Sequence, residues 1–213
     1  VKAMCLLAEQ YRVSGQVEEA QQCLSQLEST PTALLGRALC LGMSSKAADK
    51  ENAILALSHI KGIAYLSALF HKGRLYEEIG QYQNAEKAYV AVLNKDPKHM
   101  ETLYRRGILQ LTRLNNPKAA LVTLDTILHQ YKRDTVILEQ KAHALIILGQ
   151  YQDAIETLNE ILRIDASHTR ALTLKTTAES LRSNTGYFTA IASDSAQTIT
   201  QAAKSLWGYF RWN

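Results

Sequence analysis

Apolar residues recur along the chain at three- and four-residue steps, which is the spacing of one face of an amphipathic helix. A large apolar side chain stands four residues after each of five alanines, and another stands seven residues after each. The alanines are separated by 33, 32, 35 and 34 residues and are Ala20, Ala53, Ala85, Ala120 and Ala154. We therefore predict one buried helix face, repeated along the chain, in which each small alanine lets a second helix approach closely.

A residue suited to the left-handed backbone conformation stands five residues before four of these alanines: Gly15, Gly80, Asn115 and Gly149. Glycine and asparagine at such places are typical of helix C-termini. The segment LGQYQDAIETLNEILRID at 148–165 nearly repeats IGQYQNAEKAYVAVLNKD at 79–96. Each unit is therefore predicted to be a helix, a tight turn and a second helix. With only three prolines and ten glycines in the chain, we expect no sheet.

This spacing, with a small residue in the first helix, a turn glycine, an alanine in the second helix and Pro97 after the third unit, resembles the tetratricopeptide repeat family. The resemblance covers about residues 1–168. It implies an all-α, right-handed superhelical solenoid of about five helix-turn-helix repeats, with a concave groove. The expected units are about 1–32, 33–65, 66–99, 100–134 and 135–168, followed by a C-terminal capping helix at 169–182, so that residues 1–182 form the solenoid.

Two segments depart from the repeat pattern. The fourth unit carries one extra residue before its alanine and a proline at Pro117, which predicts a local bulge or a longer turn. Residues 187–213 follow another rule, because six apolar residues step by four and three positions: Ala192, Ala196, Ile199, Ala203, Leu206 and Phe210. This seam predicts an extra long amphipathic helix. It could pack along the solenoid, make a dimer or neighbouring-chain contact, or touch a membrane surface, and the scarcity of basic residues disfavours the membrane.

Composition narrows the classes of partner. Apolar residues make up 46% of the chain, which suits a buried core, and no apolar run is long enough to cross a bilayer. The net charge of +4 comes from residues 66–134, which carry eleven basic and seven acidic side chains. A solvated surface and a patch for an acidic partner both fit this excess. No helix is dense in Lys and Arg, so we expect no nucleic-acid binding.

The N-terminal segment VKAMCLLAEQYRV lacks an initiator Met and already lies within the helical pattern, so we expect the chain to be cut from a longer protein. Cys5, Cys23 and Cys40 show no metal-ligand spacing and are interpreted as small apolar residues. Nothing in the sequence demands an oxidising compartment, which favours a cytoplasmic location.

Catalytic motifs are missing from the sequence. It contains no glycine-rich phosphate loop, no HExxH, no GxSxG and no clustered carboxylates, and its six histidines are scattered. We therefore expect no enzymatic activity, no cofactor and no metal.

The family resemblance also implies which side chains face a partner. In tetratricopeptide repeats the first helix of each pair lines the groove, and alignment assigns this role to Phe70, His71, Arg74, Tyr104, Arg105, Ile108, Glu139 and His143. The guanidinium groups of Arg74 and Arg105 would each offer two N–H donors to a carboxylate. Some family members clamp the C-terminal carboxylate of heat-shock chaperones with Lys, Asn and Arg side chains. Here the corresponding places in the first unit hold Cys5 and Glu9, which disfavours that partner class.

The sequence thus predicts a non-catalytic scaffold that binds a peptide or helix of a partner protein, one with acidic character, in the concave groove. An alternative from a different class stays open. The chain would then be a structural assembly module, which packs against its own copies through the C-terminal helix or against the rest of a longer parent chain.

Overall fold

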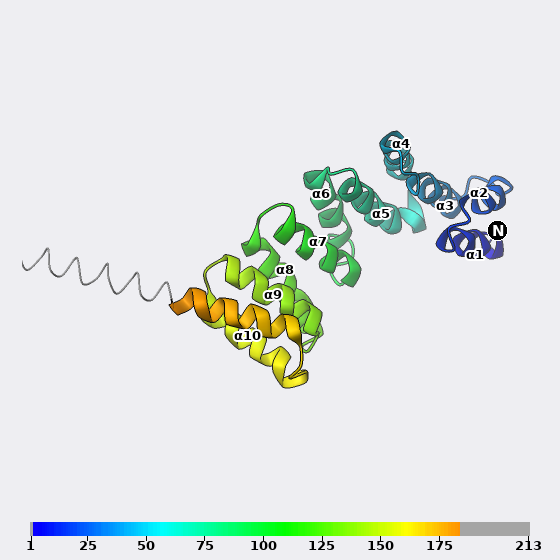
Figure 1. Ribbon diagram of the computed structural model, residues 1–213. Coiled ribbons are helices and arrows are strands. Elements are labelled where there is room, and N and C mark those ends of the chain that lie inside the picture. The colour runs from blue at the N-terminus through cyan, green and yellow to red at the C-terminus, as the bar shows by residue number, and fades with distance from the viewer. Residues whose placement is uncertain (1, 184–213) are drawn as a thin grey trace, which may run out of the picture. The chain divides into compact units, whose positions relative to one another are not determined.

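The computed structural model describes residues 2–183, and every regular element in this range is helical (Figure 1). The all-α prediction is confirmed for this part of the chain. The predicted amphipathic helix at 187–213 lies outside the described residues. The chain divides into two compact units, the first ending at Ile127 and the second beginning at Leu128. No helix between residues 2 and 183 is both long and apolar enough to cross a membrane.

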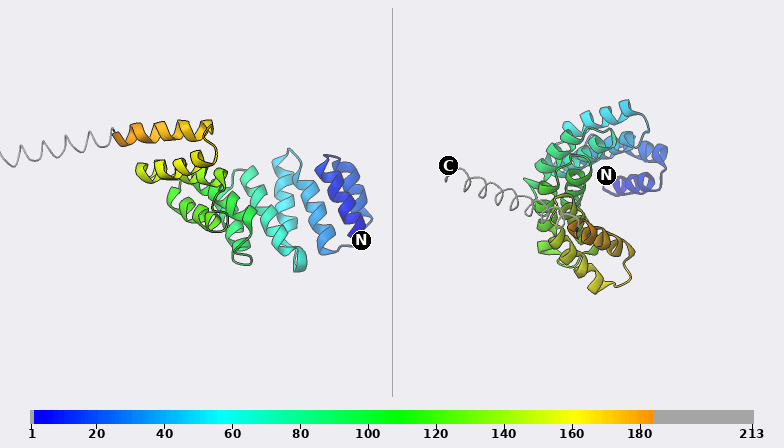
Figure 2. Two further views of the ribbon diagram at one scale, coloured as in Figure 1. Left: turned by 90° about the horizontal axis from the view of Figure 1, so that it is seen from below. Right: turned by 60° about the vertical axis from the view of Figure 1, so that its left-hand side comes forward.

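The first unit is a stack of helix pairs that follow one another in chain order. α1 packs against α2, α3 against α4 and α5 against α6, and each pair also packs against the next (Figure 2). A short 3-10 helix, η1, precedes α5 and packs against α3. The elements that begin in this unit are α1 (Lys2–Val13), α2 (Val17–Ser25), α3 (Pro31–Gly42), α4 (Ala47–Ser58), η1 (Gly62–Ala64), α5 (Tyr65–Glu78), α6 (Tyr82–Leu93), α7 (Met100–Thr112) and α8 (Pro117–Gln130). The boundary between the units falls within the last turn of α8.

The second unit contains α9 (Thr135–Ile147), α10 (Tyr151–Ile164) and a further helix over residues 169–183. The Asp134 side chain caps α9 by accepting hydrogen bonds from the backbone N–H groups of Val136 and Ile137, at 3.0 and 3.2 Å. α9 packs against α10, and Ala171 of the last helix joins their common core. The helix at 169–183 coincides with the predicted cap, whereas its role in ending the repeat array stays a prediction.

The alanines of the repeated pattern lie at the centres of the helix contacts. All five, Ala20, Ala53, Ala85, Ala120 and Ala154, are 0% exposed. The residues four positions later are buried as well, from Leu24 at 2% exposed to Tyr89 at 0%. Because an alanine side chain ends at Cβ, the neighbouring helix can come close at each of these places. The predicted buried face is confirmed.

The turns between paired helices have the predicted backbone geometry. Gly15, Gly80 and Gly149 have φ angles of 82°, 77° and 74°, and Asn115 has a φ of 47°. After each glycine the next backbone N–H donates back across the end of the first helix, as from Gln81 to the carbonyl of Tyr76 at 2.8 Å. This is the Schellman arrangement, which satisfies a carbonyl that the helix itself leaves unpaired.

The fourth unit absorbs its extra residue in a longer turn, as predicted. Residues 113–116 separate α7 from α8, whereas residues 79–81 separate α5 from α6. The side-chain carbonyl of Asn116 accepts a hydrogen bond from the N–H of Ala119 at 3.2 Å and caps α8. Pro117 occupies the first helical position, where a missing N–H costs nothing.

Replacing Gly80 with alanine is expected to lower the free energy of unfolding by about 1 kcal/mol, because the left-handed conformation is strained for a residue with a Cβ. No atom lies within 4 Å of the added Cβ, so the loss would come from the backbone alone. Gly80→Asn is the matched control, since asparagine tolerates this conformation, and it should cost less. Urea denaturation followed by circular dichroism measures both changes. Equal stability of Gly80→Ala and wild type would contradict the turn geometry.

Candidate functional site

A groove of about 740 Å³ lies in the first unit among α1, α3, η1 and α5. Its apolar lining includes Leu6 of α1, Leu35 and Leu39 of α3, and Ile63 of η1. Leu6 and Ile63 are 62% and 91% exposed, so both side chains are open to a partner. The groove therefore presents apolar surface that no described residue covers.

The composition of α3 makes this groove apolar. α3 reads PTALLGRALCLG and contains one charged residue, Arg37. The guanidinium of Arg37 donates hydrogen bonds to the backbone carbonyls of Leu24 and Leu27, at 2.8 and 2.7 Å, where α2 ends. Because this cation is used to cap α2, α3 contributes no free charge to the groove.

The charged groups that do line the groove compensate one another. The guanidinium of Arg12 donates two hydrogen bonds to the carboxylate of Glu9, at 2.8 and 2.5 Å. These bonds hold the pKa of Glu9 below its ordinary value. The pKa of His71 is lowered to about 4, chiefly by burial and then by the positive charges of Arg74 and Arg12, so its imidazole is neutral at neutral pH. The groove is therefore close to electrically neutral.

A second cluster adjoins the groove through His71 and joins α5, α6 and α7. The ring of Phe70 lies 5.3 Å from that of His71, 6.2 Å from that of Tyr89 and 5.4 Å from that of His99. The guanidinium carbon of Arg105 lies 5.9 Å from the centre of the Phe70 ring. The hydroxyl of Tyr89 donates to the carboxylate of Glu77, and burial raises the pKa of this tyrosine.

Two arginines of this cluster have unused donors. The Nε atoms of Arg74 and Arg105 are buried and make no hydrogen bond. Arg105 Nε lies 3.5 Å from a carboxylate oxygen of Glu101, within ion-pair range but without hydrogen-bond geometry. A buried N–H without an acceptor costs free energy. Both arginines are half-buried as residues, so a carboxylate would be received by their other guanidinium N–H groups and not by the buried Nε atoms.

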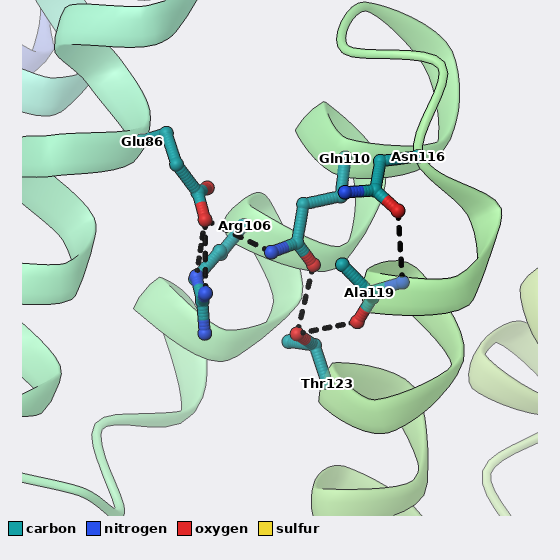
Figure 3. Close-up of polar contacts among 6 residues, drawn as sticks. All are labelled: Glu86, Arg106, Gln110, Asn116, Ala119 and Thr123. Carbon is teal, nitrogen blue, oxygen red and sulfur yellow. Dashed lines mark hydrogen bonds and ion pairs between the residues drawn. The ribbon is translucent and has the colours of Figure 1, made fainter.

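A polar network holds α7, the helix that carries Arg105, against its two neighbours (Figure 3). Arg106 and Gln110 of α7 donate to a carboxylate oxygen of Glu86 on α6, each at 2.9 Å. The hydroxyl of Thr123 on α8 donates to the side-chain carbonyl of Gln110 at 2.8 Å. Gln110 and Thr123 are 2% and 4% exposed, so the bond between them is shielded from water, and the network fixes how α7 sits between α6 and α8.

The eight residues predicted to face a partner are distributed over both units. Phe70, His71, Arg74 and Arg105 come together in the cluster on α5 and α7, with Tyr104 and Ile108 on the same α7. Glu139 and His143 lie on α9 in the second unit, where Glu139 pairs with Arg170 at 2.9 Å. Phe70 and Glu139 are only 5% and 8% exposed, so they offer a partner little surface. The role of the eight as a binding site stays a prediction.

The sequence interpretation missed most of the groove itself. Of the predicted residues only His71 lines it, whereas Leu6, Leu35, Leu39 and Ile63 were not selected. The long stretch of α3 without a free charge was the signal that could have pointed to an apolar wall. Ile63 had no such signal, because it lies on η1, outside the repeat pattern.

Two segments of the chain match the family model described as Tetratricopeptide repeat, residues 66–99 and residues 137–168. The first segment covers α5 and α6, and the second covers most of α9 together with α10. Among curated proteins, the chain is similar to the DnaJ homolog subfamily C member 7 homolog of Dictyostelium discoideum, with 31% identity over 123 residues. This match spans 53% of the chain and 22% of that relative, so the chain covers only about a fifth of the relative's length.

Solved structures show the same fold at low sequence identity. PilF of Pseudomonas aeruginosa superimposes with a TM-score of 0.66 and 16% identity, over 87% of this chain and 85% of that one. The first TPR of Spaghetti (RPAP3), solved bound to the HSP90 peptide SRMEEVD, matches with a TM-score of 0.50 and 17% identity, over 55% of this chain and 93% of that one. At these identities the likeness establishes the fold alone.

Proposed function

The chain carries repeats of the tetratricopeptide repeat family, and from this premise we propose that it is a non-catalytic scaffold that binds a peptide segment of a partner protein. The binding surface is the groove among α1, α3, η1 and α5, together with the adjoining arginine cluster on α5 and α7. The observation that carries this proposal is the groove of about 740 Å³ with exposed apolar walls. Concave, mostly apolar sites of roughly this volume are typical of ligand-binding surfaces.

The proposed partner segment carries an acidic residue next to its apolar part. Arg74 and Arg105 support this assignment, because both are half-buried cations in the cluster that adjoins the groove. A carboxylate between two guanidinium groups accepts charge-assisted hydrogen bonds, which are stronger than those between neutral groups. The RPAP3 repeat solved with a bound peptide supports the use of this fold for peptide capture.

Reversing both charges in Arg74→Glu with Arg105→Glu is expected to weaken peptide binding by about tenfold or more, because a carboxylate would then face two carboxylates. The probes are fluorescent copies of peptides selected on the wild-type chain from a displayed library of random peptides. Fluorescence polarisation at rising salt measures affinity, and the salt dependence seen with wild type should flatten in the double variant.

Lys95→Glu with Lys98→Glu is the matched control, since it changes the net charge equally at two exposed positions outside the groove. This control should bind the peptides as wild type does. Equal binding by both double variants would show that the arginine cluster is an ordinary solvated surface. A library from which wild type retains no peptide would overturn the proposed function.

A further inference from the structure

The turn between α4 and α5 differs from the other connections in the described part of the first unit. It contains η1, and Gly62 at its start has a φ of 72°. Ile60 near the start of this connection and Ala64 at its end are 2% and 5% exposed and belong to the core around α3 and α4. Ile63 stands between these anchors and is 91% exposed. The turn is thus fixed at both ends, and it holds an isoleucine out of the core.

The exposed isoleucine lies at the groove, where other apolar side chains face the same space. α3 packs against both α1 and η1 and forms the floor between them. Leu35 and Leu39 of this floor are half-buried, whereas Leu6 of α1 and Ile63 of η1 flank it and are mostly exposed. Full burial of one such side chain is worth about 1.5–3 kcal/mol, so an occupant that covers both flanks gains most from these two residues.

The charge balance of the groove determines which side chains an occupant can place in it. Arg12 neutralises Glu9, and His71 is uncharged at neutral pH. A charged side chain entering between Leu6 and Ile63 would lose its hydration and find no free opposite charge. The unused donors of Arg74 and Arg105 belong to the cluster on α5 and α7, outside the groove lining. The groove therefore suits uncharged apolar side chains and excludes acidic ones.

We infer that Leu6 and Ile63 are the specificity-determining contacts of this groove, and that they select a partner peptide with uncharged apolar side chains at the positions that enter it. This inference rests on the proposed function and adds the chemistry of the groove's occupant. Covering these two side chains would remove more apolar surface from water than covering the half-buried leucines of the floor. The turn containing η1 would then be a recognition element added to the repeat.

The test compares three aspartate variants of the full 213-residue chain: Ile63→Asp, Leu6→Asp and Leu55→Asp. Leu55 on α4 is the matched control, because it is 61% exposed, close to the 62% of Leu6, and does not line the groove. Random peptides are selected on wild type and their affinities are measured by fluorescence polarisation. Ile63→Asp and Leu6→Asp should each weaken binding by about tenfold or more, whereas Leu55→Asp should keep the wild-type affinity. The selected peptides should share apolar positions.

Other outcomes separate this inference from the proposed function. Should Ile63→Asp and Leu6→Asp keep full affinity while Arg74→Glu with Arg105→Glu loses it, peptide binding would stand and the assignment of Leu6 and Ile63 would be wrong. Peptides bound equally by wild type and by all groove and arginine variants would overturn both proposals. If light scattering shows a wild-type dimer that Ile63→Asp dissociates, and no peptide is retained, the occupant is a second copy of the chain and the inference fails. Peptide binding that appears only after removal of residues 184–213 would overturn it in favour of that segment.

Discussion

Replacing Gly73 with alanine is expected to lower the free energy of unfolding by about 2 kcal/mol, although alanine is the better helix former. Gly73 lies within α5, and a Cβ placed there would be 2.5 Å from Cε1 and 2.8 Å from Cδ1 of Tyr89. The Tyr89 ring is 0% exposed and its hydroxyl is bonded to Glu77, so the ring has no room to move away. Urea denaturation of the full chain, followed by circular dichroism, measures the loss.

Gly107→Ala is the matched control for this substitution. Gly107 also lies inside the first helix of its pair, α7, but its added Cβ would be 3.2 Å from a methyl carbon and 3.5 Å from Cγ of Leu124, and 3.7 Å from Cγ2 of Thr123. A leucine side chain can shift by a few tenths of an ångström, and the gain in helix propensity then offsets the contact. Gly107→Ala should therefore leave stability unchanged or raise it. If both variants are as stable as wild type, the Tyr89 ring is not packed tightly against the α5 backbone at Gly73.

The fold was predictable because each of its determinants is local in sequence. A buried alanine such as Ala85 is identified by the apolar residues four and seven positions later, which any helix places on the same face. A turn such as that at Gly80 is identified by a residue that tolerates a positive φ at a fixed distance from that alanine. These two signals are enough to predict that the helices before and after each turn pack against each other, because a tight turn leaves them side by side.

The candidate site was less predictable because it depends on packing between units of the repeat. The family resemblance implied a groove-facing position for Phe70, yet this side chain is only 5% exposed and packs among three aromatic rings. Arg74 and Arg105 could be named as donors from sequence, but only the packed structure reveals that their Nε atoms lack acceptors. Ile63 lies on an element outside the repeat, so no periodic pattern could indicate its exposure.

His71 is expected to make the chain lose stability on acidification within a defined pH window. Its pKa is about 4 in the folded chain, lowered first by burial and then by Arg74 and Arg12, while Glu101 and Glu9 raise it. In the unfolded chain a histidine titrates near its ordinary value, 6.5. Between these values the unfolded state binds the proton and the folded state does not. The contribution of neutral His71 is therefore fully present above pH 6.5 and is lost as the pH falls towards about 4.

The difference should reach about 2 kcal/mol at about pH 4.5, which urea denaturation at this pH and at about pH 7 can resolve. His71→Gln removes the titrating group, so its stability should fall less over this range than that of wild type. His59→Gln, which changes an exposed histidine at the end of α4, is the matched control and should follow wild type. Parallel loss of stability in all three proteins would mean that His71 is not held neutral by its surroundings. The imidazole of His71 would then become positively charged as the pH falls through the ordinary pKa of histidine. An acidic side chain could in that case enter the groove where we propose that only apolar ones bind.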